Sequence, residues 1–245
     1  MYETLLFDET DGIATVTLNR EGGNRICMRM VRELTAVCDH LEDESDARVV
    51  VFRGADGAFS EGIDFGDFHP DKPLDIHGFN KWEKLCTRLE RLPKATVALV
   101  DGGARGGGFQ IALVCDLRVA TSRAVFQLPE VHLGFLPGMG TFRFAKYVGL
   151  GHAKRICMTC EEVTAARAVE LGFIDRLDDD LDAGLAWALE ALGPNHSVAI
   201  ELTRRLLNES FATSYENAIG HFLAAQHRAI SQTAFLETIR DQQKS

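Results

Sequence analysis

The sequence predicts an α/β fold in which a largely parallel β-sheet lies between helices. Two observations lead to this prediction: apolar runs of strand length recur between residues 13 and 120, and segments with helical spacing separate them. A strand, a helix and a second strand in this order form a parallel crossover unit. With 245 residues the chain can bury a sizeable core, and we expect one domain, with or without a small appended subdomain.

The first elements are predicted from changes in the spacing of apolar residues. Residues 13–18 alternate apolar and polar side chains, as a strand covered on one face does. After a turn at Gly22 and Gly23, apolar side chains recur every three or four positions over residues 28–41, which predicts a helix. The continuous apolar run at residues 48–52 is typical of a strand that is buried on both faces.

The alternation of helices and strands continues to residue 120. A helix at residues 79–92, which Pro93 ends, precedes a strand at residues 96–100. A Gly-rich turn then leads into a helix at residues 109–114 and a strand at residues 117–120. Beyond about residue 150 the strand signals fade, and the remaining predicted helices cover residues 152–158, 164–171, 181–192, 196–208 and 215–230. This helical segment can pack on its own core or on a neighbouring subunit.

The composition excludes several classes of protein. Hydrophobic residues make up 46% and charged residues 25% of the chain, which is ordinary for a globular protein and unlike a disordered or disulfide-stapled one. The 26 Lys and Arg against 36 Asp and Glu give a net charge of −10, which argues against unspecific binding to nucleic acid or to anionic membranes. An anionic ligand would have to be held by a few local cations or by backbone amides.

Other features favour a cytoplasmic protein without a metal site. No apolar stretch is long enough to span a membrane, and the first residues lack the layout of a signal peptide. The six cysteines lie in apolar stretches and are expected to be buried thiols. Cys157 and Cys160 have the spacing of half a redox or zinc site, but no second Cys or His pair at metal-ligand spacing accompanies them.

Two Gly-containing turns, each after a predicted strand, are the first candidates for a site. Residues 57–64 contain Gly62, Ile63 and Asp64, and residues 101–110 contain Gly106, Gly107 and Gly108 in a row, followed by Gln110. Three glycines that open a helix let the backbone approach a ligand and leave free N–H groups, as an anion or oxyanion site requires. The alternative is that they only permit tight helix packing. The spacing does not match a dinucleotide-binding fingerprint.

The third candidate is Glu130, which follows Pro129 in an apolar stretch. A carboxyl group held rigidly in a poorly hydrated place has a raised pKa, in the range useful for proton transfer. The alternative is a solvent-facing Glu at a turn. His132 lies two residues further on, so on an extended segment both side chains would point the same way, and His132 could be a second proton carrier.

These segments, in this order and spacing, resemble the crotonase superfamily, which is also called the enoyl-CoA hydratase/isomerase family. The matching pieces are residues 18–20, 59–64, 106–112, 114–116, 126–130, 136–138, 164–168 and 171–174. The resemblance implies a crotonase-like ββα spiral core over residues 1–175, followed by a helical segment over residues 176–245 for oligomerisation and pocket closure. It also implies a homotrimer or a hexamer.

The resemblance further implies an acyl-thioester enzyme. The substrate would be a thioester of coenzyme A or of carrier-protein phosphopantetheine, and no separate cofactor would be needed. By position, the backbone N–H groups of Ile63 and Gly107 would form the oxyanion hole, and Glu130 would be the acid/base. The other substrate-binding positions would be Gly62, Gly106, Asp64 and His132, although Asp64, like Asp116, is interpreted mainly as holding a turn.

One departure from the family pattern decides the expected reaction. Hydratases of the family use two glutamates, and Gln110 stands where the first would be, so it can orient a group but cannot accept a proton near neutral pH. Double-bond isomerisation needs one carboxylate and is therefore the leading hypothesis. The alternatives are a hydratase, a decarboxylase, a hydrolase of carbon–carbon bonds in β-diketones, or a non-catalytic thioester-binding subunit. The hydrolases use a His near position 130 and an acid near position 139, where this chain has Glu130 and Met139.

Overall fold

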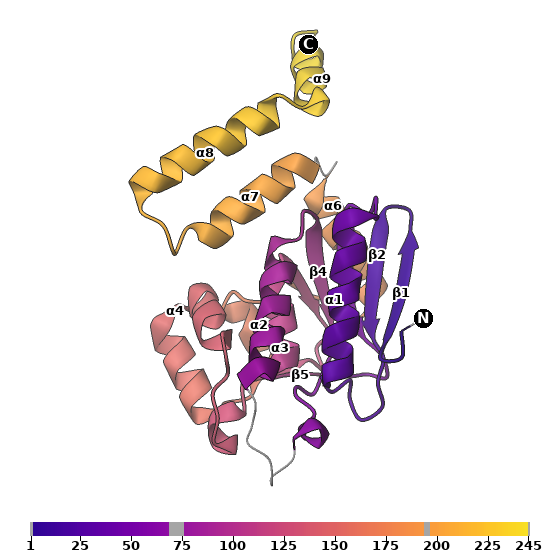
Figure 1. The fold of residues 1–245 in the computed structure, drawn as a ribbon, viewed down its shortest axis with the longest axis vertical. Helices are drawn as coiled ribbons and strands as arrows, with labels where there is room; N and C mark the ends of the chain where they lie inside the picture. The colour runs from indigo at the N-terminus through magenta and orange to yellow at the C-terminus, as the bar shows by residue number, and fades with distance from the viewer. Residues whose placement is uncertain (1, 69–75, 194–196, 245) are drawn as a thin grey trace.

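The protein is described by a computed structural model that covers residues 2–68, 76–193 and 197–244. Its centre is a six-stranded sheet in the order β1-β2-β3-β4-β6-β9 (Figure 1). The hairpin of β1 (Leu5–Thr10) and β2 (Ile13–Leu18) is antiparallel. The parallel strands beside it are β3 (Val49–Gly54), β4 (Ala95–Val100), β6 (Leu117–Ala120) and β9 (Arg176–Leu177). The fold class predicted from the sequence is thus confirmed.

A second, three-stranded sheet and the helices surround this centre. The small sheet consists of β5 (Gly103–Arg105), β7 (Val125–Gln127) and β8 (Val163–Thr164). The α-helices are α1 (Met28–Asp43), α2 (Ile76–Arg91), α3 (Gly107–Val114), α4 (Gly140–Thr159), α5 (Ala165–Glu170), α6 (Leu181–Leu192), α7 (Ser197–Glu209), α8 (Tyr215–Ile230) and α9 (Thr233–Gln242). Two 3-10 helices, η1 (Phe65–Asp67) and η2 (Glu130–Leu133), lie in the connections.

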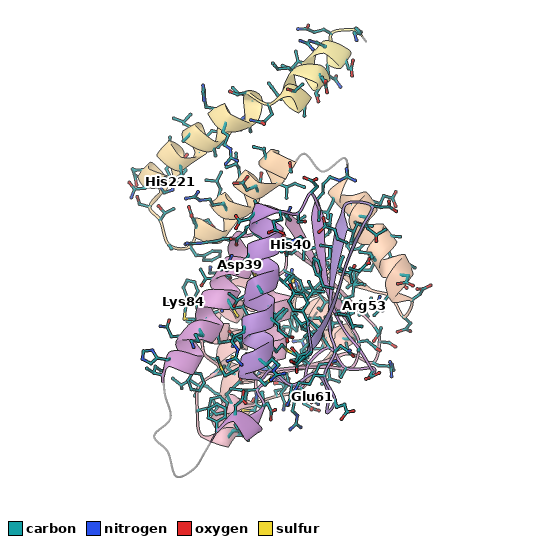
Figure 2. The ribbon with its side chains drawn as sticks, turned by 45° about the vertical axis from the view of Figure 1, so that its right-hand side comes forward. Asp39, His40, Arg53, Glu61, Lys84 and His221 are labelled. Atoms are coloured by element: carbon teal, nitrogen blue, oxygen red, sulfur yellow. The ribbon has the colours of Figure 1, made fainter. Side chains whose placement is uncertain are left out.

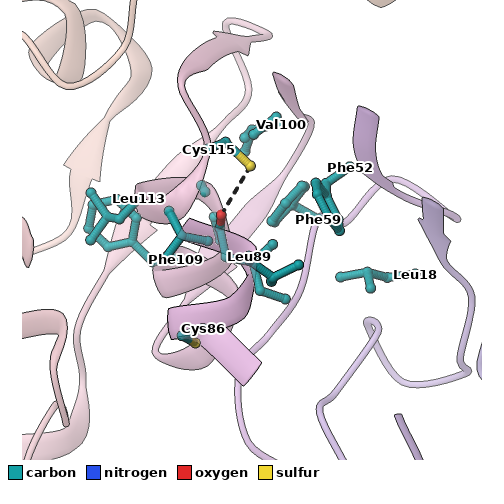
Figure 3. Packing of buried hydrophobic residues seen from close by; sticks show 14 of the residues in the cluster. Leu18, Phe52, Phe59, Cys86, Leu89, Val100, Phe109, Leu113 and Cys115 are labelled. Atoms are coloured by element: carbon teal, nitrogen blue, oxygen red, sulfur yellow. Dashed lines mark hydrogen bonds between the residues drawn. The ribbon is translucent and has the colours of Figure 1, made fainter. Parts of the chain in front are cut away.

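The central sheet is buried on both faces, as the continuous apolar strands predict. In β3, Val50 and Phe52 belong to the main core under α1, α2 and α3, whereas Val49 and Val51 face a second apolar cluster that α6 covers. Figure 3 shows part of the main core, where Phe52 of β3 lies among side chains from neighbouring elements. Alternate side chains of β3 are thus buried on opposite faces of the sheet. A shift by one residue would exchange the two sets, so this burial fixes the register of the strand.

The sequence did not predict several of the observed elements. β1 was missed because it is an edge strand in which only Leu5 is buried and only Phe7 is partly buried. Its last three residues are exposed, so the alternation of apolar and polar residues is too short to predict a strand. The strands of the small sheet are two or three residues long and depend on tertiary pairing. α4 begins at Gly140 instead of residue 152, because it continues across a kink at Gly149, and α9 was not predicted.

The C-terminal helices differ in how they are held. α7 is fixed to the body by the buried Arg204, which donates hydrogen bonds to the carboxylate of Asp116 at 2.6 Å and to the carbonyl oxygen of Leu92 at 2.7 Å. α8 packs on α7, and α8 and α9 extend away from the sheet (Figure 1). The boundary predicted at residue 175 lies directly before β9, which pairs with β6. Among the described helices, none is both long and apolar enough to cross a membrane.

Candidate active site

The two Gly-containing turns lie against each other at the carboxyl edge of β3 and β4. Ser60 donates its backbone N–H to the carbonyl oxygen of Gly103 at 2.9 Å, and the N–H of Arg105 donates to the carbonyl oxygen of Ser60 at 2.9 Å. The turns approach so closely that a Cβ on Gly62 would stand 2.9 Å from the carbonyl oxygen of Arg105. Parallel strands place their carboxyl ends on one edge, which brings these sequence-distant turns together.

Two backbone N–H groups on these turns are available to a ligand. The N–H of Ile26 donates to Gly62 and the N–H of Asp64 donates to Ile26, which leaves the N–H of Ile63 between them. Gly107 is the first residue of α3, where a helix has no internal acceptor for its N–H. Within residues 2–68, 76–193 and 197–244, neither of these two N–H groups has a hydrogen-bond acceptor. Both residues line the same cavity.

Glu130 lies in this cavity and is nearly buried. Only 5% of the residue is exposed, and within the described part of the chain its Oε2 has no hydrogen-bond partner. Burial raises the pKa of the Glu130 carboxyl group above its usual value, and a hydrogen bond with its own backbone opposes this weakly. The predicted poorly hydrated carboxyl group is therefore present.

Because burial raises its pKa, Glu130 should make stability depend on pH. The unfolded chain ionises this group at the ordinary Glu pKa, and the folded protein does so only at a higher pH. The neutral carboxyl group makes its full contribution to the free energy of unfolding below the ordinary Glu pKa. This contribution is lost as the pH rises through the raised pKa of the folded protein. We expect Glu130→Gln to melt at a higher temperature than the wild type above this window, with the difference shrinking toward acidic pH. A difference in melting temperature between the two proteins that does not change with pH across this window would contradict the expectation.

The side chain of Gln110 is buried and has a fixed orientation. Its Oε1 accepts a hydrogen bond from Nη1 of Arg143 at 3.2 Å, and its Nε2 donates to the carbonyl oxygen of Pro137 at 3.3 Å. The opposite orientation would place donor against donor at Arg143 and acceptor against acceptor at Pro137. In this orientation Nε2 keeps one N–H hydrogen that the carbonyl oxygen of Pro137 does not use.

The cavity brings four of the predicted site residues together. It has a volume of about 450 Å³ and is lined by Ile63, Gly107, Gln110 and Glu130. Most of its remaining wall is apolar, and the apolar residues that line it include Ile26, Val31, Phe68, Phe79, Trp82, Phe135 and Leu136. Two exposed cations, Arg32 and Lys81, also line it. Apolar walls with a few convergent polar groups are typical of a small-molecule site.

The other predicted substrate-binding residues lie outside the lining. Gly62 and Gly106 shape the two turns behind Ile63 and Gly107. Asp64 accepts a hydrogen bond from the N–H of Gly66 at 2.9 Å and pairs with Arg20, and both interactions lower its pKa. Asp64 thus holds the start of η1, as the turn interpretation expects.

The expected geometry of His132 was wrong. Residues 130 to 133 form the 3-10 helix η2 and not an extended segment, so Glu130 and His132 do not share a face. Glu130 is buried, whereas His132 is exposed, and its backbone N–H donates to Sγ of Cys160 at 3.4 Å. The η2 turn therefore carries one side chain inward, and a second proton carrier at position 132 is not supported.

Three charged residues near Gln110, namely Arg143, Glu83 and Glu90, were missed. Arg143 is 5% exposed, and its guanidinium pairs with the carboxylates of Glu83 and Glu90, each at 2.9 Å. Glu83 also lines the cavity. No sequence signal connects these residues, because α2 carries Glu83 and Glu90 while α4 carries Arg143. Only the packing of α4 across α3 and α2 brings them together.

Arg105, which directly precedes the row of glycines, is paired within the protein itself. It pairs with Glu61 at 3.0 Å and with Glu162 at 2.6 Å, and it donates to the side chain of Gln127 at 3.1 Å. These contacts join the first turn to the strand that precedes Glu130. In Figure 2, Glu61 lies in the lower part of the view, well away from His221 of α8 in the upper part.

The fold and the cavity define a protein of the crotonase class. The structure superimposes on an enoyl-CoA hydratase of Bacillus anthracis with a TM-score of 0.92 and 24% identity, covering 99% of this chain and 96% of the other. Pseudomonas aeruginosa AtuE gives a TM-score of 0.87 and 30% identity, with 94% and 93% covered. The Enoyl-CoA hydratase/isomerase family model matches residues 8–243, and the chain belongs to this family.

Two relatives match over most of their length. The Bacillus subtilis (strain 168) protein YngF, provisionally named an enoyl-CoA hydratase/isomerase, is 31% identical over 95% of this chain and 91% of its own. A short-chain-enoyl-CoA hydratase of Clostridium acetobutylicum is 29% identical, with 95% of this chain and 94% of its own covered. The family resemblance inferred from the motifs is thus confirmed.

Proposed function

We propose that the protein isomerises the double bond of an enoyl thioester, with Glu130 as its single acid/base. The observation that carries this proposal is that a buried carboxyl group with a raised pKa shares one cavity with two backbone N–H groups that have no acceptor among the described residues. The N–H groups of Ile63 and Gly107 would hold the thioester oxygen, on which negative charge develops in the enolate.

In this mechanism one proton moves between two carbons of the substrate. The Glu130 carboxylate removes a proton from the α-carbon of a β,γ-enoyl thioester, and the electrons of that bond move into a dienolate. Glu130 then returns the proton to the γ-carbon, which leaves the double bond between the α- and β-carbons. The raised pKa of Glu130 makes its carboxylate a stronger base for removing the proton. It also brings the pKa of Glu130 nearer to that of the substrate C–H group, which favours proton transfer in both steps.

Hydration is the second candidate, because a relative at 29% identity is named a short-chain-enoyl-CoA hydratase. Gln110 cannot take a proton from water near neutral pH, so addition of water would need another base.

The decarboxylase, the β-diketone hydrolase and the non-catalytic binding subunit lack a supporting observation of this kind. Supplying purified protein with β,γ-enoyl, α,β-enoyl and malonyl-type thioesters and with a cyclic β-diketone, and identifying bound ligands and products by mass spectrometry, separates all five. Conversion of the β,γ-enoyl thioester alone supports the proposal, and hydration without isomerisation contradicts it.

The substrate carrier would be coenzyme A or a phosphopantetheine on a carrier protein. Arg32 and Lys81 support this, because they place two cations beside the cavity of a chain whose net charge is −10. No further cofactor enters the proposed chemistry. The proposed location is the cytoplasm, on the sequence grounds given above.

We expect the protein to form a homotrimer or a hexamer through α8 and α9. These two helices contain no buried residue, and they leave large apolar side chains exposed, including Phe222, Leu223, Phe235 and Leu236. Such a surface is costly in water unless a second copy covers it. Sedimentation should show an oligomer for the wild type and smaller species for Phe222→Glu with Leu223→Glu, whereas Gln226→Glu on the same helix should leave the mass unchanged. A monomeric wild type would contradict this expectation.

A further inference from the structure

One end of the cavity is polar although most of its wall is apolar. Glu83 of α2, Gln110 of α3 and Gly138 of the turn before α4 line this end together. The reaction proposed above uses none of these three groups to move a proton. Both groups have partners in the protein, but these partners leave one acceptor position and one N–H hydrogen unused, and this spare capacity is open to a ligand group in the cavity.

Contacts on its outer side hold the carboxylate of Glu83 in place. Its Oε2 accepts from Nη1 of Arg143 at 2.9 Å, and its Oε1 accepts from the backbone N–H of Met139 at 3.0 Å. Each carboxylate oxygen can accept a second hydrogen bond. Arg143 is itself committed, because its other nitrogens donate to Glu90 at 2.9 and 3.1 Å. Glu83 is therefore a positioned acceptor with capacity to spare.

Gln110 supplies a donor beside this acceptor. One hydrogen of its Nε2 is used by the carbonyl oxygen of Pro137, and the second remains. Gly138 brings the two groups to one place, because a Cβ on this residue would stand 2.7 Å from Oε1 of Glu83 and 3.4 Å from Nε2 of Gln110. Because these distances of 2.7 and 3.4 Å add to 6.1 Å, Oε1 of Glu83 and Nε2 of Gln110 are at most 6.1 Å apart, a separation that one ligand oxygen can bridge with two hydrogen bonds.

A hydroxyl group matches this pair, because it donates one hydrogen bond and accepts others. A carboxylate would pair with Gln110 but would face the negative charge of Glu83. An ammonium group would pair with Glu83 but would face the N–H of Gln110. A methyl group would leave the spare acceptor of Glu83 and the spare donor of Gln110 unused, which a site built for hydrogen bonding disfavours.

We propose that Glu83 and Gln110 bind a hydroxyl group on the acyl chain, so that the preferred substrate is a hydroxylated acyl thioester. This inference rests on the proposed function, since it assumes that an acyl thioester occupies the cavity. Glu83 is then a specificity-determining residue, and Arg143 is a positioning residue that fixes both Glu83 and the amide of Gln110.

The test compares acyl thioesters of coenzyme A that have the same chain length. The chains are unsubstituted or carry a hydroxyl, a carboxylate or an ammonium group, with the substituent moved along the chain from the β-carbon outward. We expect the best hydroxylated chain to bind about 10- to 100-fold more tightly than the unsubstituted one, as measured by calorimetry with saturated acyl groups. Turnover of the corresponding enoyl thioesters should show the same preference in kcat/KM.

Two matched variants assign this preference to Glu83. Glu83→Gln and Glu90→Gln each replace one carboxylate partner of Arg143 by an amide, but only Glu83 lines the cavity. We expect Glu83→Gln to lose most of the preference for the hydroxyl and Glu90→Gln to keep it, with melting temperatures showing that both are folded. Equal preference in the two variants, or a stronger preference of the wild type for the carboxylate or the ammonium group, would overturn the inference.

The same experiment separates this inference from the proposed function. Binding of the acyl thioesters without any preference for a hydroxyl overturns the role of Glu83 alone. If none of the thioesters binds, the proposed function fails, and the inference that depends on it fails as well. Tight binding of hydroxylated chains without turnover keeps the inference and contradicts the isomerase proposal.

Discussion

Replacing Glu130 by Gln should lower the turnover of a β,γ-enoyl thioester by about 10²- to 10⁴-fold, which is the usual contribution of a general acid/base. The amide has nearly the same shape as the carboxyl group but cannot carry a proton between two carbons. Since the two N–H groups at Ile63 and Gly107 are unaffected, the thioester should still bind. We therefore expect kcat to fall while the dissociation constant of a saturated acyl thioester changes little.

Glu161→Gln is the matched control for this experiment. Glu161 pairs with Arg155 at 2.9 Å and does not line the cavity, so the same chemical change should leave turnover close to that of the wild type. Full activity of Glu130→Gln would show that another group moves the proton. A wild type that binds thioesters without converting them would favour the non-catalytic subunit.

The sequence predicted best what depends on local pattern. The strand at residues 48–52 was predicted to be buried on both faces because it is continuously apolar, and the structure divides its side chains between two cores. The turns at Ile63 and Gly107 and the position of Glu130 came from motifs whose spacing along the chain is preserved. The two turns meet at the carboxyl ends of β3 and β4 of the central sheet, and Glu130 follows β7, which pairs in parallel with β5 of the small sheet, so all three residues line one cavity.

What the sequence could not predict depends on contacts between distant segments. The orientation of Gln110 is set by Arg143 and by the carbonyl oxygen of Pro137, and neither partner stands at a motif position. His132 was misplaced because the chain after Pro129 closes into a 3-10 turn, which Gly134 ends with φ of 83°. The apolar faces of α8 and α9 have regular helical spacing, but that spacing does not tell whether the same chain or another covers them.

Gly106→Ala should be the most damaging substitution that changes no ionisable or hydrogen-bonding side chain. Gly106 has φ of 50° and ψ of −118°, a conformation that residues with a Cβ adopt only with strain. Its missing Cβ matters as well, because an added methyl group would stand 2.7 Å from Oε1 of Glu130. The alanine must displace either the carboxyl group or the turn that presents the N–H of Gly107. We expect turnover to fall by at least about 10²-fold, as it does when one oxyanion donor is lost.

Gly172→Ala separates the effect on the cavity from the effect on the backbone. Gly172 also has a positive φ, of 80°, but no heavy atom lies within 4 Å of its added Cβ. Both variants should lose stability by about 1–3 kcal/mol, as denaturant unfolding would measure, because each forces alanine into a strained conformation. Only Gly106→Ala should lose turnover, because only there does the new methyl group reach Glu130. If the two variants kept equal activity, displacing the Glu130 carboxyl group or the Gly106 turn would have no effect on turnover. The proposed proton transfer by Glu130 next to the N–H group of Gly107 would then be contradicted.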